Sequence, residues 1–337
     1  MVKLKYKYAI GCLIQWYEVE MVEEYLQSVK NALKRIENKE NVIVDLYFNM
    51  STALEKIDES KMDMFKIIRR FSGMEEDLKR DKINLNVQTL GGNMLHELEV
   101  IYTIADYRRD FNDKYCEKVD VLMWGESDSL IPGQTFEVLD LLHDNNTNQN
   151  IYKYVTFFGG CKMWDDSWKP VEHNDFTDKP FIENDIKNWW SLRYVMNIDE
   201  MNKINDKVEE LDVRNVNPFK FNGCGLVISS DIVKAGVNIP RSAFFIHEDT
   251  AFMFSLMKTL GNEIPQFVFK NILLVHNRKH VKKRFYVKGE NDVIEGDVSG
   301  GRLKHNWYKR ASDMSHHNTY NMFNQSKIYT WKDVFDV

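Results

Sequence analysis

The chain has 337 residues and a mass of 39.9 kDa, of which 43% are hydrophobic and 28% charged. With 16 Gly, 6 Pro and a net charge of -6, this composition excludes disordered, collagen-like and strongly cationic proteins. The longest apolar runs, such as 9–14, are far shorter than the ~20 residues that span a bilayer. The N-terminus lacks a full signal-peptide core, so we expect a soluble cytoplasmic protein, in the host cytoplasm if the source is viral.

The first half of the chain alternates strand-like and helix-like segments. Apolar residues spaced by three and four predict helices, and β-branched or alternating runs predict strands. A strand–helix alternation of this kind indicates a parallel sheet covered by helices on both faces. In such sheets, ligands bind beyond the carboxyl ends of the strands. The predicted order is strand 6–15, helix 19–35, strand 41–48, helix 57–71, strand 83–90, helix 96–107 and strand 119–124.

The second half is less regular. A strand at 152–158 precedes an aromatic, acidic stretch at 159–216, which we interpret as an insertion. Regular structure resumes with a strand at 221–229 and a helix at 250–260, which Gly261 closes as a C-terminal cap. The last elements are a strand at 267–275 and a basic, aromatic extension at 277–337.

Two acidic residues follow the fourth predicted strand. Glu126 and Asp128 lie two positions apart directly after VDVLMWG. Carboxylates at the end of a strand can hold Mg²⁺ or Mn²⁺, whose other coordination positions take phosphate oxygens. The alternative interpretation is a solvated acidic turn.

Four pieces of sequence resemble the GT-A fold glycosyltransferases, closest to the family 2 type, over roughly residues 6–280. The order and spacing of the four pieces match that family. They are IQWYEVE with its following helix at 14–29, Glu126-Ser127-Asp128 at the D-x-D position, FNGCGL with SSDIVKAG at 221–236, and His247-Glu248-Asp249 before TAFMFSLMKTLG.

The resemblance implies an α/β GT-A (Rossmann-like) fold with a mostly parallel central sheet flanked by helices. It implies a catalytic domain at 1–276, with a nucleotide-sugar-binding half at 1–132 and an acceptor-side half at 151–276. The insertion 159–216 lies in the second half, and 277–337 forms the C-terminal extension. The implied activity is metal-dependent transfer of a sugar from a nucleotide donor, with UDP-sugar as the expected donor.

The resemblance also assigns roles to the acidic residues. Asp128 is the expected metal ligand, with Glu126 reaching the metal or the ribose hydroxyls, and His276 is a further candidate ligand. Asp249 is the expected general base for an inverting reaction, with Glu248 as the alternative base. Asp249 also suits a helix N-cap, and a histidine at a strand end is often purely structural.

Further residues are expected to contact the two substrates. Two positions depart from the family pattern, because Glu18 stands where the family usually has Asn and Asn49-Met50-Ser51 replaces its Asp-x-Ser turn. The donor nucleotide is therefore left open. The expected donor contacts are Gln15, Tyr17, Glu18, Asn49, Gly91, Gly92, Asn93 and Glu126, and the expected acceptor contacts are Gly223, Gly225, Trp164 and Trp168.

The acceptor is not determined by the sequence. The segment from His276 to Arg310 contains ten Lys/Arg but only four Asp/Glu, and aromatic residues are interleaved with the basic ones. This segment could bind the donor diphosphate, an anionic membrane or a nucleic-acid backbone. The expected anion contacts are Arg278, Lys282, Lys283 and Arg284.

Several functions stay open. The acceptor is a glycan, lipid or protein hydroxyl, or else a hydroxymethylated pyrimidine in DNA, as for a phage enzyme that flips 5-hydroxymethylcytosine into its pocket. A non-catalytic nucleotide-sugar-binding module is the lower alternative. A nucleotidyltransferase is disfavoured, because Gln15-Trp16-Tyr17 replaces the Gly-rich, Arg-containing loop expected after the first strand.

Overall fold

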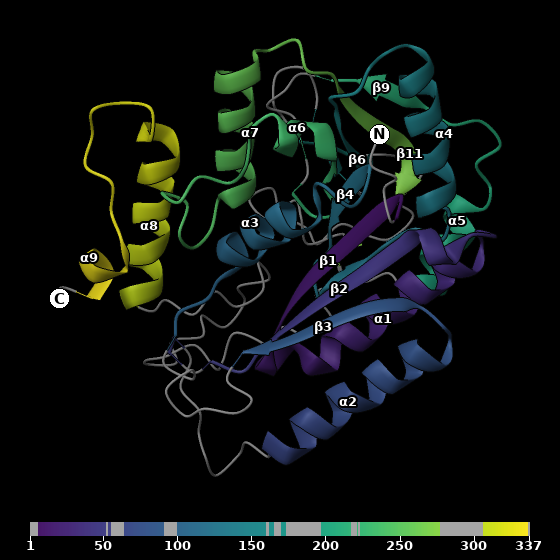
Figure 1. Cartoon of the computed structure of the whole chain (residues 1–337), viewed down its shortest axis with the longest axis horizontal. Helices are drawn as coiled ribbons and strands as arrows, with labels where there is room; N and C mark the ends of the chain where they lie inside the picture. Colours follow the sequence, from purple (N-terminus) through teal and green to yellow (C-terminus); the bar gives the residue numbers. More distant parts are fainter. Residues whose placement is uncertain are drawn as a thin grey trace.

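The computed structural model describes residues 6–51, 53–54, 64–90, 100–159, 162–164, 170–172, 197–216, 221, 223–276 and 306–335. Figure 1 shows a central sheet between helices, with the C-terminal helices at one side. The strands are β1 Tyr8–Gln15, β2 Val42–Asn49, β3 Asn84–Leu90, β4 Val121–Trp124, β5 Ser129–Leu130, β6 Val155–Gly159, β7 Lys162–Trp164, β8 Pro170–Glu172, β9 Val213–Asn215, β10 Val227–Ser229, β11 Gln266–Leu273 and β12 Val275–His276. The helices are α1 Val19–Lys34, α2 Met64–Arg80, α3 Ile104–Tyr115, α4 Thr135–Asn148, α5 Ile198–Asn205, α6 Ser230–Lys234, α7 Glu248–Leu260, α8 Asn306–Asn321 and α9 Trp331–Phe335, with short 3-10 turns at Trp16–Glu18 and Lys39–Asn41.

The described residues form an eight-stranded sheet in the order β3-β2-β1-β4-β10-β6-β11-β9. Strands β1 to β4 pair in parallel, β10 pairs antiparallel with both β4 and β6, and β11 returns to the parallel direction beside β6. Only β9 and β10 therefore run against the other six strands. The predicted α/β class with a mostly parallel central sheet is confirmed.

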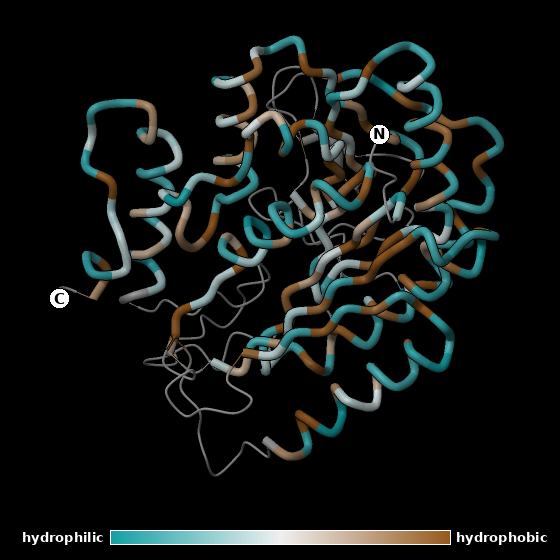
Figure 2. Tube along the Cα trace, in the orientation of Figure 1, coloured by the Kyte–Doolittle hydropathy of each residue, from teal (hydrophilic) through white to brown (hydrophobic). Residues whose placement is uncertain are grey.

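Alternation along the central strands explains why both faces of the sheet are covered. In β1, Tyr8, Ile10 and Cys12 face one hydrophobic core while Ala9 and Leu13 face the other. Helices α1, α2 and α4 pack on the first face, and α3, α6 and α7 pack on the second. Figure 2 shows the result, with hydrophobic central strands and hydrophilic outer helix surfaces. Because β1, β2, β3 and β4 run parallel, their carboxyl ends lie at one common edge of the sheet.

The C-terminal extension carries helices that the sequence did not indicate. Helices α8 and α9 pack through Ala311 and Val334 against Phe244, in the loop that precedes α7. The Trp331 ring contacts Phe244 and Phe245 edge-on, with ring centroids 5.1 and 5.5 Å apart. This contact brings the end of the chain next to the start of α7.

Several predicted boundaries were wrong. The second helix runs to Arg80 rather than residue 71, and the third is α3, whose first residue is Ile104 rather than residue 96. The strand predicted at 221–229 is reduced to β10, and α4 was not predicted. In the part of the chain that the structure describes, no helix combines the length and hydrophobicity needed to cross a membrane.

Candidate functional site

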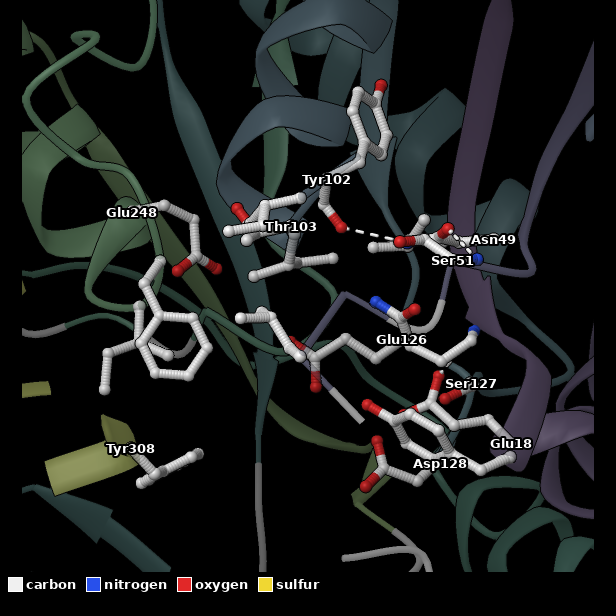
Figure 3. Close-up of a pocket in the computed structure, with 18 residues that line it drawn as sticks. Glu18, Asn49, Ser51, Tyr102, Thr103, Glu126, Ser127, Asp128, Glu248 and Tyr308 are labelled. Carbon is white, nitrogen blue, oxygen red and sulfur yellow. Dashed lines mark hydrogen bonds between the residues drawn. The ribbon is translucent and has the colours of Figure 1, made fainter. Parts of the chain in front are cut away.

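A pocket of about 290 Å³ lies at the carboxyl ends of β1, β2 and β4. Figure 3 shows its side chains, with Glu248 on one side and Asp128 and Glu18 on the other. The pocket is where a sheet of this topology is expected to bind its ligand. Its described lining is Leu13, Gln15, Tyr17, Glu18, Asn49, Ser51, Leu54, Ile101, Tyr102, Thr103, Ile104, Glu126, Ser127, Asp128, Phe245, Ile246, Glu248 and Tyr308.

The turn after β1 contributes Gln15, Tyr17 and Glu18, three of the expected donor contacts, to the lining of the pocket. The 3-10 turn Trp16–Glu18 follows β1 directly, and it places the Trp16 side chain in the hydrophobic core. Glu18 accepts a hydrogen bond from the Gln15 backbone N–H at 3.1 Å. The glutamate that replaces the expected asparagine therefore stabilises its own turn as well as lining the pocket.

The end of β2 is tied to the segment before α3. The Asn49 amide donates to the carbonyl of Tyr102 at 2.9 Å, and its oxygen accepts from the Ser51 backbone N–H at 2.9 Å. The Ser51 hydroxyl donates to the Val100 carbonyl at 2.5 Å. Together these bonds hold Asn49 and Ser51 in fixed orientations at the pocket wall, and Figure 3 shows those among Asn49, Ser51 and Tyr102. Preorganised polar groups of this kind are typical of small-molecule sites.

The turn after β4 places Glu126, Ser127 and Asp128 at the pocket, and Asp128 is only 7% exposed. Ser129 closes the turn by donating through both N–H and hydroxyl to the Glu126 carbonyl at 3.0 Å. Strand β12 pairs antiparallel with β5, so the His276 backbone lies opposite Ser129. The two candidate metal-binding segments are therefore adjacent.

Helix α7 begins at the pocket with Glu248 and Asp249. Its N-cap is His247, a non-glycine residue with φ of 64°, so Asp249 lies inside the first turn and is not the cap. Glu248 lines the pocket, whereas Asp249 is not among the lining residues. One Asp249 oxygen, Oδ1, accepts from the Thr250 backbone N–H at 2.6 Å. The other, Oδ2, would lie 2.0 Å from a Cβ on Gly223.

The two glycines of the FNGCGL segment have different structural roles. Gly223 leaves room for the Asp249 carboxylate, which links an expected acceptor position to the expected base. Gly225 has φ of +73°, and a Cβ there would lie 2.4 Å from Leu274 Cδ1. The backbone conformation and packing alone account for glycine at position 225.

A buried arginine that the sequence did not indicate connects the two halves of the site. Arg108 on α3 forms ion pairs with Glu126 at 2.6 Å and with Glu248 at 2.5 Å. Its guanidinium carbon lies 4.9 Å from the centre of the Trp124 ring. The sequence did not indicate that Arg108 is buried, because its two carboxylate partners lie 18 and 140 residues away along the chain.

The site is strongly acidic. As far as the described lining extends, its charged side chains are the carboxylates Glu18, Glu126, Asp128 and Glu248. Burial raises the pKa of Glu248 to about 7, while Arg108 opposes the rise and Asp249 adds to it. Asp128 and Glu248 are buried and Glu18 and Glu126 half-buried, and carboxylates that face one cavity in this way favour a bound cation.

The remaining predicted residues lie away from the pocket lining or outside the described residues. Trp164 ends the short strand β7, and Trp168 lies outside the described residues. The predicted donor loop and the predicted anion contacts also fall outside the described residues: Gly91, Gly92, Asn93, Arg278, Lys282, Lys283 and Arg284.

Other lining residues were missed by the sequence analysis. Tyr102 and Thr103 come from the segment before α3, which was predicted as helix. Phe245 and Tyr308 come from the loop before α7 and from α8, and their rings meet edge-on at 5.2 Å. The C-terminal extension thus contributes an aromatic wall through α8.

Comparisons with known proteins give structural similarity only. No protein-family model and no curated protein matches the chain. Among solved structures, S. aureus TarS 1-349 is 12% identical with a TM-score of 0.44, covering 97% of this chain and 77% of TarS. A 4-diphosphocytidyl-2C-methyl-D-erythritol synthase from Anaerococcus prevotii is 11% identical with a TM-score of 0.35, over 80% and 90% of the two chains. The galactosyltransferase LgtC, solved with donor and acceptor sugar analogs, is 10% identical with a TM-score of 0.33, over 92% and 95%. Identities and TM-scores this low describe overall arrangement and assign no activity or ligand.

Proposed function

We propose that this protein is a glycosyltransferase that moves a sugar from a nucleotide donor to an acceptor hydroxyl. One observation carries the proposal. Carboxylates from the β1 turn, the β4 turn and the start of α7 line a single pocket beside Asn49 and Ser51, at the carboxyl edge of the parallel strands. A nucleotide needs polar groups for its base and ribose, and its diphosphate needs a cation.

The lining residues fit a divalent cation. In the described part of the chain, no three His, Cys, Asp or Glu side chains form a preassembled metal cluster. Mg²⁺ and similar ions are often held by one or two carboxylates and completed by substrate phosphates. Asp128 is the proposed ligand, and Glu126 and His276 lie on adjacent segments. When bound, Mn²⁺ or Mg²⁺ would neutralise the charge that develops on the leaving diphosphate.

The proposed reaction inverts the anomeric carbon. Asp249 takes the proton of the acceptor hydroxyl, whose oxygen forms the new bond to the anomeric carbon as the bond to the diphosphate oxygen breaks. The Asp249 Oδ2 atom at Gly223 supports this role, because it faces an expected acceptor segment. Glu248 is the alternative base. Asp249→Asn and Glu248→Gln form a matched pair of carboxylate-to-amide substitutions. The base is the residue whose substitution abolishes sugar transfer while Mn²⁺-dependent binding of the donor persists.

The charge of the pocket bears on the acceptor. Its described lining carries the carboxylates of Glu18, Glu126, Asp128 and Glu248 and no positively charged side chain, although Arg108 compensates Glu126 and Glu248 from behind. The remaining negative charge disfavours a long phosphate backbone, whereas the proposed cation would bridge the short diphosphate of a donor. This favours a glycan or another uncharged hydroxyl compound over 5-hydroxymethylcytosine in DNA.

The proposal is tested by measuring nucleoside diphosphate release from a panel of nucleotide sugars with Mn²⁺. Parallel reactions contain oligosaccharides, unmodified DNA or DNA with 5-hydroxymethylcytosine, and mass spectrometry records the gain on each acceptor. We expect Mn²⁺-dependent release and a hexose- or pentose-sized gain on a glycan. A gain on the modified base would reassign the acceptor to DNA. No release with any donor would contradict the proposed function.

A further inference from the structure

The guanidinium of Arg108 occupies a buried position between two segments that are far apart in the chain. Its side chain is 2% exposed, and Glu126 and Glu248 bind its two terminal nitrogens separately. Glu126 belongs to the β4 turn that carries Asp128, and Glu248 begins the helix that carries Asp249. One side chain therefore joins the expected metal-binding turn to the expected base.

The arginine is itself held in place. Its guanidinium stacks on Trp124, whose indole N–H donates to the Asn112 oxygen at 2.9 Å. Trp124 also packs edge-on against Phe252 of α7, with ring centroids 5.3 Å apart. Stacking on a fixed ring leaves the planar fork of donors little freedom to rotate, which a lysine could not reproduce.

We propose that Arg108 is a positioning residue that sets the separation between the β4 turn and the start of α7. The proposal deepens the proposed function and rests on it, because it assigns these two segments to the donor and acceptor sides of one reaction. Glu248 is buried and Glu126 is half-buried, and two such carboxylates that share one cation are left uncompensated when the cation is removed. Loss of Arg108 therefore moves Glu126 and Glu248 apart and displaces Asp249 from its working position.

The test uses Arg108→Met, Arg108→Lys and Arg108→Met/Glu248→Gln in the full chain at pH 8. Arg109→Met, alone and combined with Glu248→Gln, is the matched control. Arg109 lies on the same helix, but it binds the carbonyls of Ile239 and Ala243 at 2.9 Å and pairs with Asp106 of its own helix at 3.0 Å. Melting temperature and steady-state transfer are both measured, so that one readout is independent of turnover.

We expect Arg108→Met to lower the Tm and the added Glu248→Gln to restore much of the loss, because it removes one of the two facing carboxylates. The same Glu248→Gln change should not rescue Arg109→Met. For transfer, Arg108→Met should lower kcat by about 10²-fold with little change in donor KM, as a displacement of about 1 Å can do. Arg108→Lys should recover Tm more than kcat, because it keeps the charge without the fork.

Three results would overturn the proposal. The first is a folded Arg108→Met whose Tm is not raised by Glu248→Gln. The second is a Tm rescue of Arg109→Met by Glu248→Gln of equal size. The third is a kcat for Arg108→Met within threefold of the wild type, where threefold is about 0.65 kcal/mol of activation free energy. If the wild-type chain turns over no donor, the proposed function fails, and the Tm comparison alone decides whether Arg108 joins the two acids.

Discussion

The contact between Gly223 and Asp249 allows a sharp test of the proposed base. A Cβ at position 223 would lie 2.0 Å from Asp249 Oδ2, 2.8 Å from its Cγ and 3.0 Å from its Cβ. A Cβ atom essentially never lies within 3.0 Å of a non-bonded heavy atom, so in Gly223→Ala the Asp249 side chain or the backbone at position 223 must shift, by about 1 Å at Oδ2. A displacement of about 1 Å can lower the rate about 10²-fold.

The assay is kcat for sugar transfer, together with the midpoint of urea unfolding. Gly223→Ala should lower kcat by about 10²-fold, with a stability loss of about 1–3 kcal/mol from overpacking. Gly73→Ala in α2 is the matched control, because a Cβ there meets nothing within 4 Å. It should leave kcat unchanged and stabilise the helix by about 0.5–1 kcal/mol. A folded Gly223→Ala with wild-type kcat would refute the link between this contact and the chemistry.

Three further predictions concern the pocket and its support. Because burial raises the pKa of Glu248 to about 7, activity that needs its carboxylate should fall as the pH drops through that value, and a pH–rate profile of Glu248→Gln should lack this limb. Tyr308→Ala should raise the acceptor KM several-fold while Tyr308→Phe retains it, since the ring lines the pocket against Phe245; equal effects of both changes would contradict a contact made by the ring. Phe252→Ala should lower the free energy of unfolding in urea by about 3–5 kcal/mol, because the fully buried Phe252 ring on the inner side of α7 packs against Trp124. A loss below about 1 kcal/mol would contradict that packing.

The central sheet was predictable because its strands carry their own signal. Runs such as YAIGCLIQ and VIVDLYFN are apolar and β-branched, and strict alternation sends successive side chains to two separate cores. The acidic turn after β4 was predictable for the same reason, since a polar turn must follow where a buried strand ends. Its position at the pocket follows from the parallel topology.

Other features depend on tertiary contacts. Helix α8 has a polar sequence, NWYKRASDMSHHNTYN, and only its packing against the loop before α7 reveals an inner face. The ion pairs of Arg108 link residues that lie 18 and 140 positions apart, so no local sequence pattern predicts them. The N-cap of α7 was also missed, because His247 takes a left-handed conformation that its residue type does not predict.

The central claim is that the acidic pocket binds a nucleoside diphosphate through a divalent cation held by Asp128. Calorimetric titration of UDP and GDP, with and without Mn²⁺, tests it most directly in the wild type and in Asp128→Asn. We expect Mn²⁺ to strengthen binding of one nucleotide by about tenfold or more, a gain of ~1.4 kcal/mol or more, and Asp128→Asn to lose that gain while its Tm is kept. Equal affinity with and without Mn²⁺, or an undiminished gain in Asp128→Asn, would contradict the claim.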